Sequence, residues 1–423
     1  MTGTWCCELE LSGLVALTGV EPFGGQEMAR VLVRLHGEPL GYLTERCLGG
    51  LPAADEVRGR ASQLFASRLA AHLLTEGSQL VAGRVPEPGE ACPNRLRFSE
   101  FVTVVVCTRD RSDILTACLR RLQAVDYPHV EFVIVDNAAT GPATRDTVSS
   151  FTDRDRRFRY VAEPLPGLSR ARNRGLSEAR GDVVAYTDDD VAVDPGWVHG
   201  LLLGFARHPD AACVTGLVCT ASVNGEAEAY FDARAASWST RCEPEIFDLS
   251  CHRRDDPLYP YSPGIFGTGA NFAFRRSVLL ELGGFDDALG AGSLTKGGED
   301  LDAFVRVLNA GHGLVYEPSG IVWHHHRADR SGLLKQMFAY GTGLSAFMTK
   351  CLLSRGTRGD VLRRIPLGLR RMTAIRSETE KRLASDVARP PGALSREFLG
   401  FIAGPLLYAR AERASRRLRV LQQ

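Results

Sequence analysis

The feature that most constrains the fold lies between Phe101 and Asp190, where short apolar runs alternate with segments of helical periodicity. The runs of strand length are 101–108, 131–137, 157–163 and 182–190. Strands that are apolar on both faces are typical of a mostly parallel sheet with helices on both sides. The alternation therefore predicts an α/β fold whose ligands bind at the carboxyl ends of the strands.

The rest of the chain divides around this region. Two short strands joined by a turn are predicted at 31–43, a helix at 61–74, and a linker rich in proline and glycine at 83–94. We find no chemistry before the linker and expect a docking or regulatory role there. The predicted division is a small α+β accessory module at 1–97, an α/β domain at 98–330 and a helical extension at 331–423.

Charge is distributed unevenly along the chain. The net charge of +1 lacks the basic signature of a nucleic-acid-binding protein, but residues 351–423 hold 16 Arg or Lys and 6 Asp or Glu. The apolar stretch 399–409 precedes Arg410, Arg413, Arg416, Arg417 and Arg419. An apolar patch beside a cationic one is typical of an interfacial helix, so we expect contact with an anionic membrane surface. Packing of this helix on the acidic remainder of the chain is the alternative.

The 11 cysteines include no CxxC pair, which argues against a zinc ribbon or a thioredoxin-like motif. Cys242, Cys251 and His252 are neighbours in the sequence, but we do not expect a metal site there. The N-terminus has no signal-peptide pattern, and no apolar run reaches about 18 residues. We expect a reduced cytoplasmic protein, peripheral on the inner face of the membrane if the basic region binds there.

Three adjacent carboxylates, Asp188, Asp189 and Asp190, end the fourth predicted strand. They repel one another, and a divalent cation with hard oxygen ligands supplies the missing counter-charge. The remaining coordination positions would suit phosphate oxygens of a substrate. A solvated acidic turn is the alternative, which the strand context disfavours.

Two further polar elements belong to the same edge of the predicted sheet. Asp136 ends the second strand, where a carboxylate can accept hydrogen bonds from a nucleobase or ribose, or act only as a helix cap. Arg170, Arg172 and Arg174 alternate on a predicted helix. A guanidinium near the acidic strand ends could pair with a diphosphate or with Asp136, whereas at least one of the three is expected on the surface.

Glu299 and Asp300 follow two glycines and begin an amphipathic helix. A carboxylate there could remove a proton from a hydroxyl nucleophile. The alternative is the ordinary preference for acidic residues at a helix N-terminus. The two glycines indicate a close approach of the backbone to some neighbour.

His324, His325 and His326 follow a strand-like apolar segment. Alternate residues of a strand share a face, so His324 and His326 are expected together and His325 opposite. One of the first two could complete a metal site.

In this order and spacing, the motifs resemble the family 2 glycosyltransferases with the GT-A (Rossmann-like) fold, of actinobacterial type. The segments that carry the resemblance are 102–111, 133–137, 166–182, 186–190, 267–277, 283–286, 297–300 and the histidine stretch. They cover about residues 101–327. The accessory module and the helical extension lie outside the match and look like the extensions of some actinobacterial members.

The resemblance implies a role for each matching residue. The residues implied to bind the nucleotide sugar are Thr108, Arg109, Asp136, Arg172, Asp188 and Asp189, with Asp136 on the base and Arg172 near the base or diphosphate. The implied metal ligands are Asp190, Asp188, His324 and His326, with Asp190 and His324 preferred. The family often has Tyr-Asn after the first strand, where this chain has Arg109-Asp110.

On the other side of the implied site, Gly269, Ala270 and Asn271 would border the acceptor. Asp300 would be the catalytic base, with Glu299 as its competitor. We therefore expect an inverting transferase that uses Mn²⁺ or Mg²⁺ to move a sugar from a nucleotide-diphosphate-sugar donor to an acceptor hydroxyl. The acceptor would be a saccharide, a lipid-linked saccharide or a small molecule, in envelope polysaccharide, glycolipid or secondary-metabolite glycosylation.

Two alternatives stay open. A nucleotidyltransferase-like enzyme also uses carboxylates and a metal, but it gives no reason for the arrangement of Glu299, Asp300 and the histidines. A non-catalytic nucleotide-sugar-binding protein would not need acidic residues at both positions. Neither reading involves nucleic acid.

Overall fold

The computed structural model describes residues 3–19, 25–47, 50–81, 84–383 and 390–422. Its centre is a nine-stranded sheet with the order β12-β14-β10-β13-β8-β5-β6-β7, and β9 pairs with β14. The strands β5 (Val102–Thr108), β6 (Val130–Asn137), β7 (Phe158–Glu163) and β8 (Val183–Asp188) run parallel. The predicted mostly parallel sheet is confirmed.

The other half of the sheet is mixed. Strand β13 (Asn271–Arg275) runs antiparallel to both β8 and β10 (Ala211–Thr220). Strand β14 (Gly313–His324) is parallel to β10 and also pairs with β9 (Val191–Val193) and β12 (Glu245–Phe247). This arrangement brings the end of β14 to the same edge as the end of β8.

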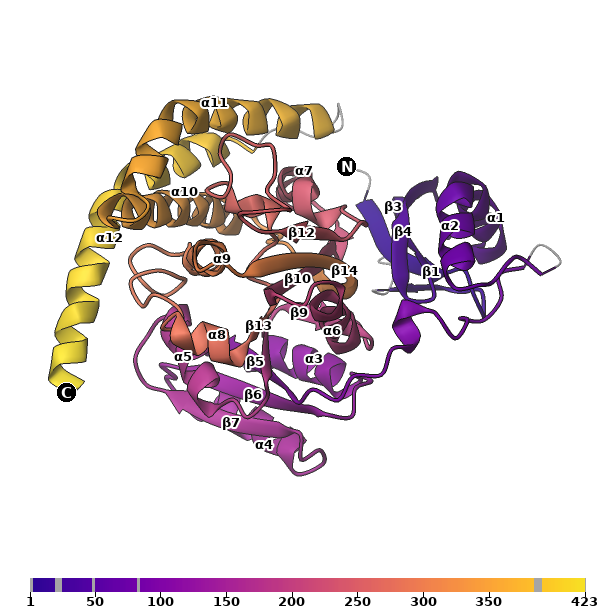
Figure 1. Ribbon diagram of the computed structural model, residues 1–423, viewed down its shortest axis with the longest axis horizontal. Helices are drawn as coiled ribbons and strands as arrows, with labels where there is room; N and C mark the ends of the chain where they lie inside the picture. Colours follow the sequence, from indigo (N-terminus) through magenta and orange to yellow (C-terminus); the bar gives the residue numbers. More distant parts are fainter. Residues whose placement is uncertain (1–2, 20–24, 48–49, 82–83, 384–389, 423) are drawn as a thin grey trace.

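Helices cover both faces of the sheet (Figure 1). On one face lie α3 (Ser112–Gln123), α4 (Ala143–Thr152) and α6 (Trp197–Arg207), and on the other lie α5 (Leu168–Glu178), α8 (Arg276–Glu281) and α9 (Glu299–Asn309). The alternation within β5 shows why its run is continuously apolar: Val104 and Val106 are buried in the first layer and Val105 in the second.

The N-terminal region forms a second, smaller sheet. Its strands are β1 (Gly3–Glu10), β2 (Leu17–Gly19), β3 (Gln26–Leu35) and β4 (Glu38–Arg46), joined at the β1 edge by β11 (Ser222–Val223) from the α/β region. The predicted hairpin is confirmed as β3 and β4. The predicted single helix is instead two helices, α1 (Ala54–Leu64) and α2 (Ala66–Thr75), which meet at Phe65.

Ion pairs fix this small sheet to the α/β region. Arg34 binds Asp194 at 2.7 Å and Arg30 binds Asp232 at 2.9 Å. The segment predicted as a linker contains a short helix, η1 (Pro93–Arg95), and Gly83 at its start lies outside the described residues.

The predicted helical character of the C-terminal region is confirmed. It consists of α10 (Arg330–Leu353), α11 (Arg358–Arg382) and α12 (Ala393–Gln422), which lie beside α7 (Glu226–Ser239) and α9 (Figure 1). Helices α10 and α12 touch backbone to backbone, because a Cβ atom at Gly341, Gly400 or Gly404 would overlap atoms of the other helix. Over the described residues, no helix is both long and apolar enough to cross a membrane.

Candidate active site

A cavity of about 1510 Å³ opens at the carboxyl ends of the parallel strands. The strand ends and the start of α9 form one side of it, and α10, α11 and α12 form the other. From the first side, the acidic triplet, Arg172, Glu299 and Asp300 reach the cavity. The charged residues that we singled out on separate strands are thus brought to one place.

The three carboxylates of the acidic triplet have different partners, and they do not all face the cavity in the same way. Asp189 is buried and accepts hydrogen bonds from Thr108 Oγ1 at 2.6 Å and from Arg111 at 2.5 Å. Asp190 accepts a bond from the second nitrogen of Arg111 at 3.0 Å and lies 3.5 Å from Arg327. Both oxygens of Asp189 are therefore held by the protein, whereas Asp188 and the Oδ1 atom of Asp190, which has His324 at 3.8 Å, remain for a ligand.

Sequence reasoning missed Arg111 and Arg327. Arg111 lies three residues after the end of β5 and pairs with two of the three carboxylates, so it offsets part of their mutual repulsion. The signal that could have found it is the charge deficit of the triplet itself, since an arginine in the loop after a neighbouring strand is close in space.

The histidines lie as the strand pattern predicts. His324 and His326 are on one side, with their Nδ1 atoms 3.3 Å apart, and His325 is exposed. His324 Nε2 is 3.8 Å from Asp190 Oδ1. His326 is turned into the protein, where its Nε2 contacts Thr220 Oγ1 and burial lowers its pKa to about 3. Of the two, His324 is the one that approaches the acidic triplet.

Arg172 is buried and joins the two acidic groups of the cavity. Its guanidinium donates to Glu299 Oε1 at 2.9 Å and to Gly269 O at 2.7 Å, and it lies 3.4 Å from Asp188 Oδ1. It also lies over the ring of Phe272. The guanidinium is thus already bound by groups of the protein. It connects the strand ends to the start of α9, and both of its terminal nitrogens already have protein partners, so neither is free to bind a diphosphate.

Glu299 and Asp300 have different surroundings although they are adjacent. Glu299 is buried against Arg172, and burial together with the charge of Asp300 raises its pKa to about 7. Asp300 lines the cavity, and a Cβ atom on Gly269 would be 2.8 Å from its Oδ2. Both carboxylates line the cavity, but Asp300 is only partly buried and is not bound by Arg172, so it is the more accessible of the two.

The two glycines before this pair have a structural neighbour. Gly298 is the N-cap residue of α9 with a φ of 91°, a conformation that favours glycine, and a Cβ atom there would lie 2.5 Å from the Gly343 carbonyl of α10. The close approach indicated by the sequence is thus to α10. The contact brings α10 to the edge of the cavity.

Of the three residues expected on the acceptor side, the structure brings two to the cavity. Gly269 and Ala270 line it, but Asn271 does not. Asn271 is fully buried, accepts a bond from Trp197 Nε1 at 2.8 Å and donates to the carbonyls of Leu217 and Gly320. In this structure Asn271 is buried away from the cavity, and its amide joins β13 to β10 and β14.

The expected nucleotide pocket lies along β5 and β6. Thr108 is held by Asp189, and Arg109 is half exposed at the rim. Asp136 is buried and accepts a hydrogen bond from Tyr160 at 2.9 Å, while its Oδ1 meets no donor among the described residues. Burial raises the pKa of Asp136. Asp136 thus keeps one acceptor position, outside the wall of the main cavity.

The C-terminal extension lies outside the family resemblance, but its three helices close the cavity. Apolar side chains from all three helices line it: Leu344, Met348, Leu352, Ile365 and Phe401. Tyr340 and Lys335 of α10 add polar groups. The apolar content of α10 was a signal for this wall, because an apolar helix needs a partner surface.

Of the three residues near Cys242 that we singled out, His252 belongs to a group of possible ligand atoms with His208 and Asp248. Cys242 is buried and Cys251 is exposed, while His252 binds Asp248 at 2.8 Å.

The mostly parallel sheet, with an acidic element at a strand end and a second acidic pair at the start of a helix facing it, is consistent with the GT-A fold. Residues 103–283 match the family model "Glycosyl transferase family 2". This segment, which is less than half of the chain, resembles the family 2 glycosyltransferases.

Curated relatives agree with this assignment. A pre-mycofactocin glycosyltransferase from Mycobacterium tuberculosis is 26% identical over 312 residues, which is 73% of this chain and 56% of that protein. A glucosyl-dolichyl phosphate glucuronosyltransferase from Haloferax volcanii is 29% identical over 45% of this chain and 57% of that protein. The chain thus spans just over half the length of these relatives. A solved mannosyltransferase from Pyrobaculum calidifontis, in complex with GDP-Man and Mn²⁺, gives a TM-score of 0.46 at 20% identity, covering 76% of this chain and 81% of that chain.

Proposed function

We propose that this chain is a metal-dependent inverting glycosyltransferase, which moves a sugar from a nucleotide-diphosphate-sugar donor to an acceptor hydroxyl. The observation that carries the proposal is the placement of Asp300. Its carboxylate faces the cavity that Asp190 and His324 also line, while the adjacent Glu299 is held by Arg172. A reachable carboxylate across from an acidic strand end is what transfer to a hydroxyl requires.

The residues at the end of β8 fit a divalent cation. Asp190 and His324, whose nearest ligand atoms are 3.8 Å apart, would hold it together with Asp188. Carboxylate oxygens suit Mg²⁺ and Mn²⁺, and an added imidazole favours Mn²⁺. When bound, the cation would neutralise the diphosphate of the leaving group.

In this proposal Asp300 accepts the proton of the acceptor hydroxyl as the oxygen attacks the anomeric carbon. A single displacement inverts the configuration at that carbon. General-base assistance of this kind contributes about 10²–10⁴-fold to the rate. Arg172 positions the pair: it holds Glu299 away from the acceptor and leaves Asp300 as the base. Asp136 would accept a hydrogen bond from the nucleobase through its free Oδ1.

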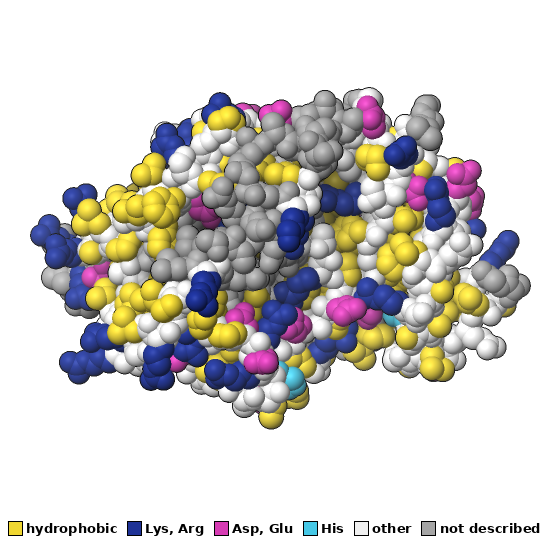
Figure 2. Space-filling model, turned by 90° about the horizontal axis from the view of Figure 1, so that it is seen from above, with side chains coloured by type: hydrophobic (Ala, Val, Ile, Leu, Met, Phe, Trp, Pro, Cys, Tyr) yellow, Lys and Arg dark blue, Asp and Glu magenta, His cyan; other side chains and the backbone are white. Residues whose placement is uncertain are grey.

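The helical wall supports an acceptor with an apolar part, and we propose a lipid-linked saccharide. Beside the cavity, the outer face of α12 carries Phe398, Leu399, Ile402 and Leu406, each more than half exposed. Figure 2 shows hydrophobic side chains gathered beside Lys and Arg at the end of the molecule where α12 lies. Exposed apolar groups next to cations favour an anionic bilayer, to which each basic residue near the surface adds about 1 kcal/mol.

The two faces of α12 differ, and its exposed face supports the proposed membrane contact. One face packs on α10 through Gly400 and Gly404, and the other is exposed. Arg410, Arg413, Arg416 and Arg417 are exposed beside it, whereas the side chain of Arg419 lies outside the described residues.

The test of the proposed function is a screen of nucleotide sugars that follows release of nucleoside diphosphate, with the anomeric configuration of the product determined by NMR. We expect a nucleoside diphosphate and an inverted product. Release of pyrophosphate would identify a nucleotidyltransferase. Donor binding by calorimetry without turnover on any acceptor would identify a non-catalytic binding protein.

A further inference from the structure

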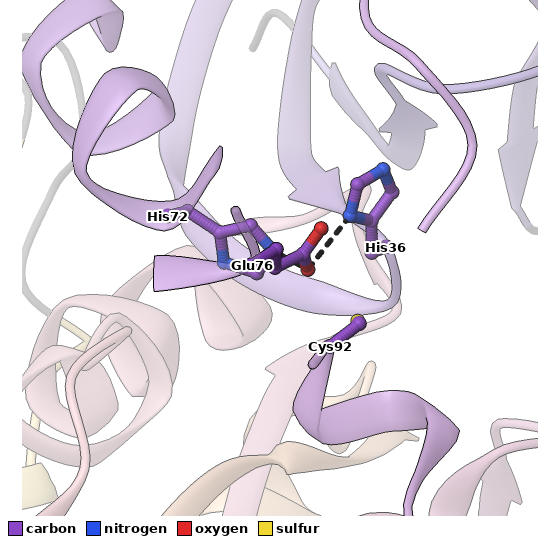
Figure 3. A group of neighbouring side chains, drawn as sticks. All are labelled: His36, His72, Glu76 and Cys92. Carbon is purple, nitrogen blue, oxygen red and sulfur yellow. Dashed lines mark hydrogen bonds and ion pairs between the residues drawn. The ribbon is translucent and has the colours of Figure 1, made fainter. Parts of the chain in front are cut away.

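A second group of ionisable side chains lies far from the cavity, in the N-terminal region. His36 follows β3, His72 and Glu76 lie at the end of α2, and Cys92 precedes η1 (Figure 3). One ligand atom from each of the four lies within 4.8 Å of all the others. His36, Glu76 and Cys92 are buried, and the side chain of His72 is 10% exposed. Four side chains of metal-binding type thus converge away from solvent.

The outer nitrogen of each imidazole is held by an acceptor. His36 Nε2 lies 2.9 Å from the carbonyl oxygen of Pro86, and His72 Nδ1 lies 3.4 Å from Glu38 Oε2. A carbonyl or carboxylate oxygen can only accept, so these nitrogens carry the protons. In a neutral imidazole the other nitrogen then has a free lone pair. This is the arrangement by which proteins orient histidines toward a metal.

Both inner nitrogens point at the same oxygen of Glu76. His36 Nδ1 is 2.9 Å and His72 Nε2 is 2.6 Å from Glu76 Oε1. His72 Nε2 is buried and meets no partner with hydrogen-bond geometry among the described residues. Glu76 Oε1 can only accept, so in the metal-free protein it attracts protons on these inner nitrogens, and a metal cation would take the place of those protons.

We propose that His36, His72, Glu76 and Cys92 bind one Zn²⁺ ion in a closed structural site. The chemistry of the donors selects the metal: imidazole and thiolate suit zinc, whereas Mg²⁺ and Mn²⁺ prefer oxygen. Four protein ligands leave no open position, as in structural rather than catalytic zinc sites. A thiolate and a carboxylate also balance the two positive charges, so the buried site is neutral overall.

Binding of the zinc ion would release protons from its ligands. Four bonds form, from Zn²⁺ to Nδ1 of His36, Nε2 of His72, an oxygen of Glu76 and Sγ of Cys92, and the S–H bond of Cys92 breaks. Its proton, with any proton on an inner imidazole nitrogen, goes to solvent. In the metal-free protein, burial raises the pKa of the Cys92 thiol to about 12. Tetrahedral ligands of zinc lie about 3.3–3.8 Å apart, so the contacts to Glu76 must lengthen by about 1 Å.

This ion would tie together three parts of the N-terminal region. Cys92 belongs to the segment predicted as a linker, and the two histidines and Glu76 belong to the hairpin and to α2. Just after Cys92, Asn94 donates to the His36 carbonyl, and the Leu96 carbonyl contacts His199 on α6. Zinc at this position would therefore order the connection between the small sheet and the transferase domain.

The test uses the full chain, stripped of metal and then given Zn²⁺ or Co²⁺ alone. We expect one tightly bound zinc per chain in an Asp190→Ala background, where the donor-side metal site is removed. The Co²⁺ form should show a thiolate-to-cobalt charge-transfer band. Cys92→Ser should abolish this band and weaken Zn²⁺ binding by about 100-fold or more, because even loss of an outer partner of a zinc ligand costs 10–100-fold. Cys251→Ser, which changes an exposed cysteine, is the matched control and should retain both.

Two results would overturn the proposal. One is a folded Asp190→Ala chain that takes up neither Zn²⁺ nor Co²⁺. The other is a Co²⁺ form without the thiolate band, which would mean that Cys92 is not a ligand. The band is measured with Cys92 intact, so it decides the matter even if Cys92→Ser does not fold. Neither result depends on sugar transfer, so failure here would leave the proposed function untouched.

Discussion

The two sides of the cavity differ in the side chains that form them. On the strand side, charged groups from four elements bind one another directly, as when Arg172 joins Asp188 to Glu299. On the helical side, apolar side chains cover the opening, and backbones touch at glycines. The two sides of the cavity thus rely on different kinds of interaction. In the proposed function, the strand side supplies the chemistry and the helical side selects and places the acceptor.

The largest expected effect tests whether the chemistry belongs to the strand side. Asp300→Asn removes the proposed base and should lower turnover by about 10²–10⁴-fold, while donor affinity stays within a few-fold. Single-turnover kinetics and calorimetry measure the two quantities. If turnover is normal in this variant and is lost in Glu299→Gln, Glu299 is the base.

The second effect concerns the cation. Activity should disappear in chelator and return with Mn²⁺ or Mg²⁺, and Asp190→Ala should weaken donor binding chiefly when metal is present, because its carboxylate would be a ligand. Donor titrations with and without metal measure this. Full activity in chelator would leave the acidic triplet as a structural or ribose-binding element.

The adjacent histidines His324 and His325 test which side chains on the strand side bind the cation. His324→Ala should raise the Mn²⁺ concentration needed for half-maximal activity by about tenfold or more, because it removes an imidazole 3.8 Å from Asp190. His325→Ala, one residue along and exposed, is the matched control and should leave it unchanged. Equal effects of the two changes would exclude a specific ligand role for His324.

A smaller effect tests the helical side. The double change Ile402→Ser and Leu406→Ser should reduce co-sedimentation with anionic vesicles several-fold, with turnover on a soluble acceptor unchanged, because both side chains point away from α10. Leu64→Ser is a matched control, since Leu64 and Ile402 are each 60% exposed. Recovery equal to that of the unaltered chain would argue against the membrane. A truncation is less suitable, because α12 closes the cavity.

The smallest effect is in stability. Burial raises the pKa of Glu299 from 4.5 to about 7, so the folded state holds this proton where the unfolded state has released it. The stability that the protonated carboxyl contributes is therefore lost as pH rises from about 4.5 to about 7. In chelator, the thermal midpoint should fall across this window less in Glu299→Gln than in the unaltered chain. Identical slopes would contradict the raised pKa.

The strand side was largely predictable and the helical side was not, for a physical reason. Apolar runs determine parallel strands, and parallel strands bring their ends together, so the place of Asp188–Asp190 at the ligand edge follows from local patterns, whereas the start of α9 was placed there by the family resemblance. The contact between α10 and α9 depends on the absence of side chains at Gly298 and Gly343, which no periodicity reports. The roles of Asn271 and Arg172 also needed coordinates. A polar residue serves the fold or a ligand according to which partners reach it, and neighbours in sequence do not reveal those partners.

The glycines between α10 and α12 have a consequence for how this protein tolerates random change. Gly341, Gly400 and Gly404 each lie against the backbone or a short side chain of the opposite helix, and a single added methyl group would force the two helices apart. In a saturation library, the least permissive positions of the C-terminal region should therefore be these three. The exposed Phe398 and Ile402 should accept many residues in any assay of folding. The packing of this wall therefore depends mainly on positions that carry no side chain.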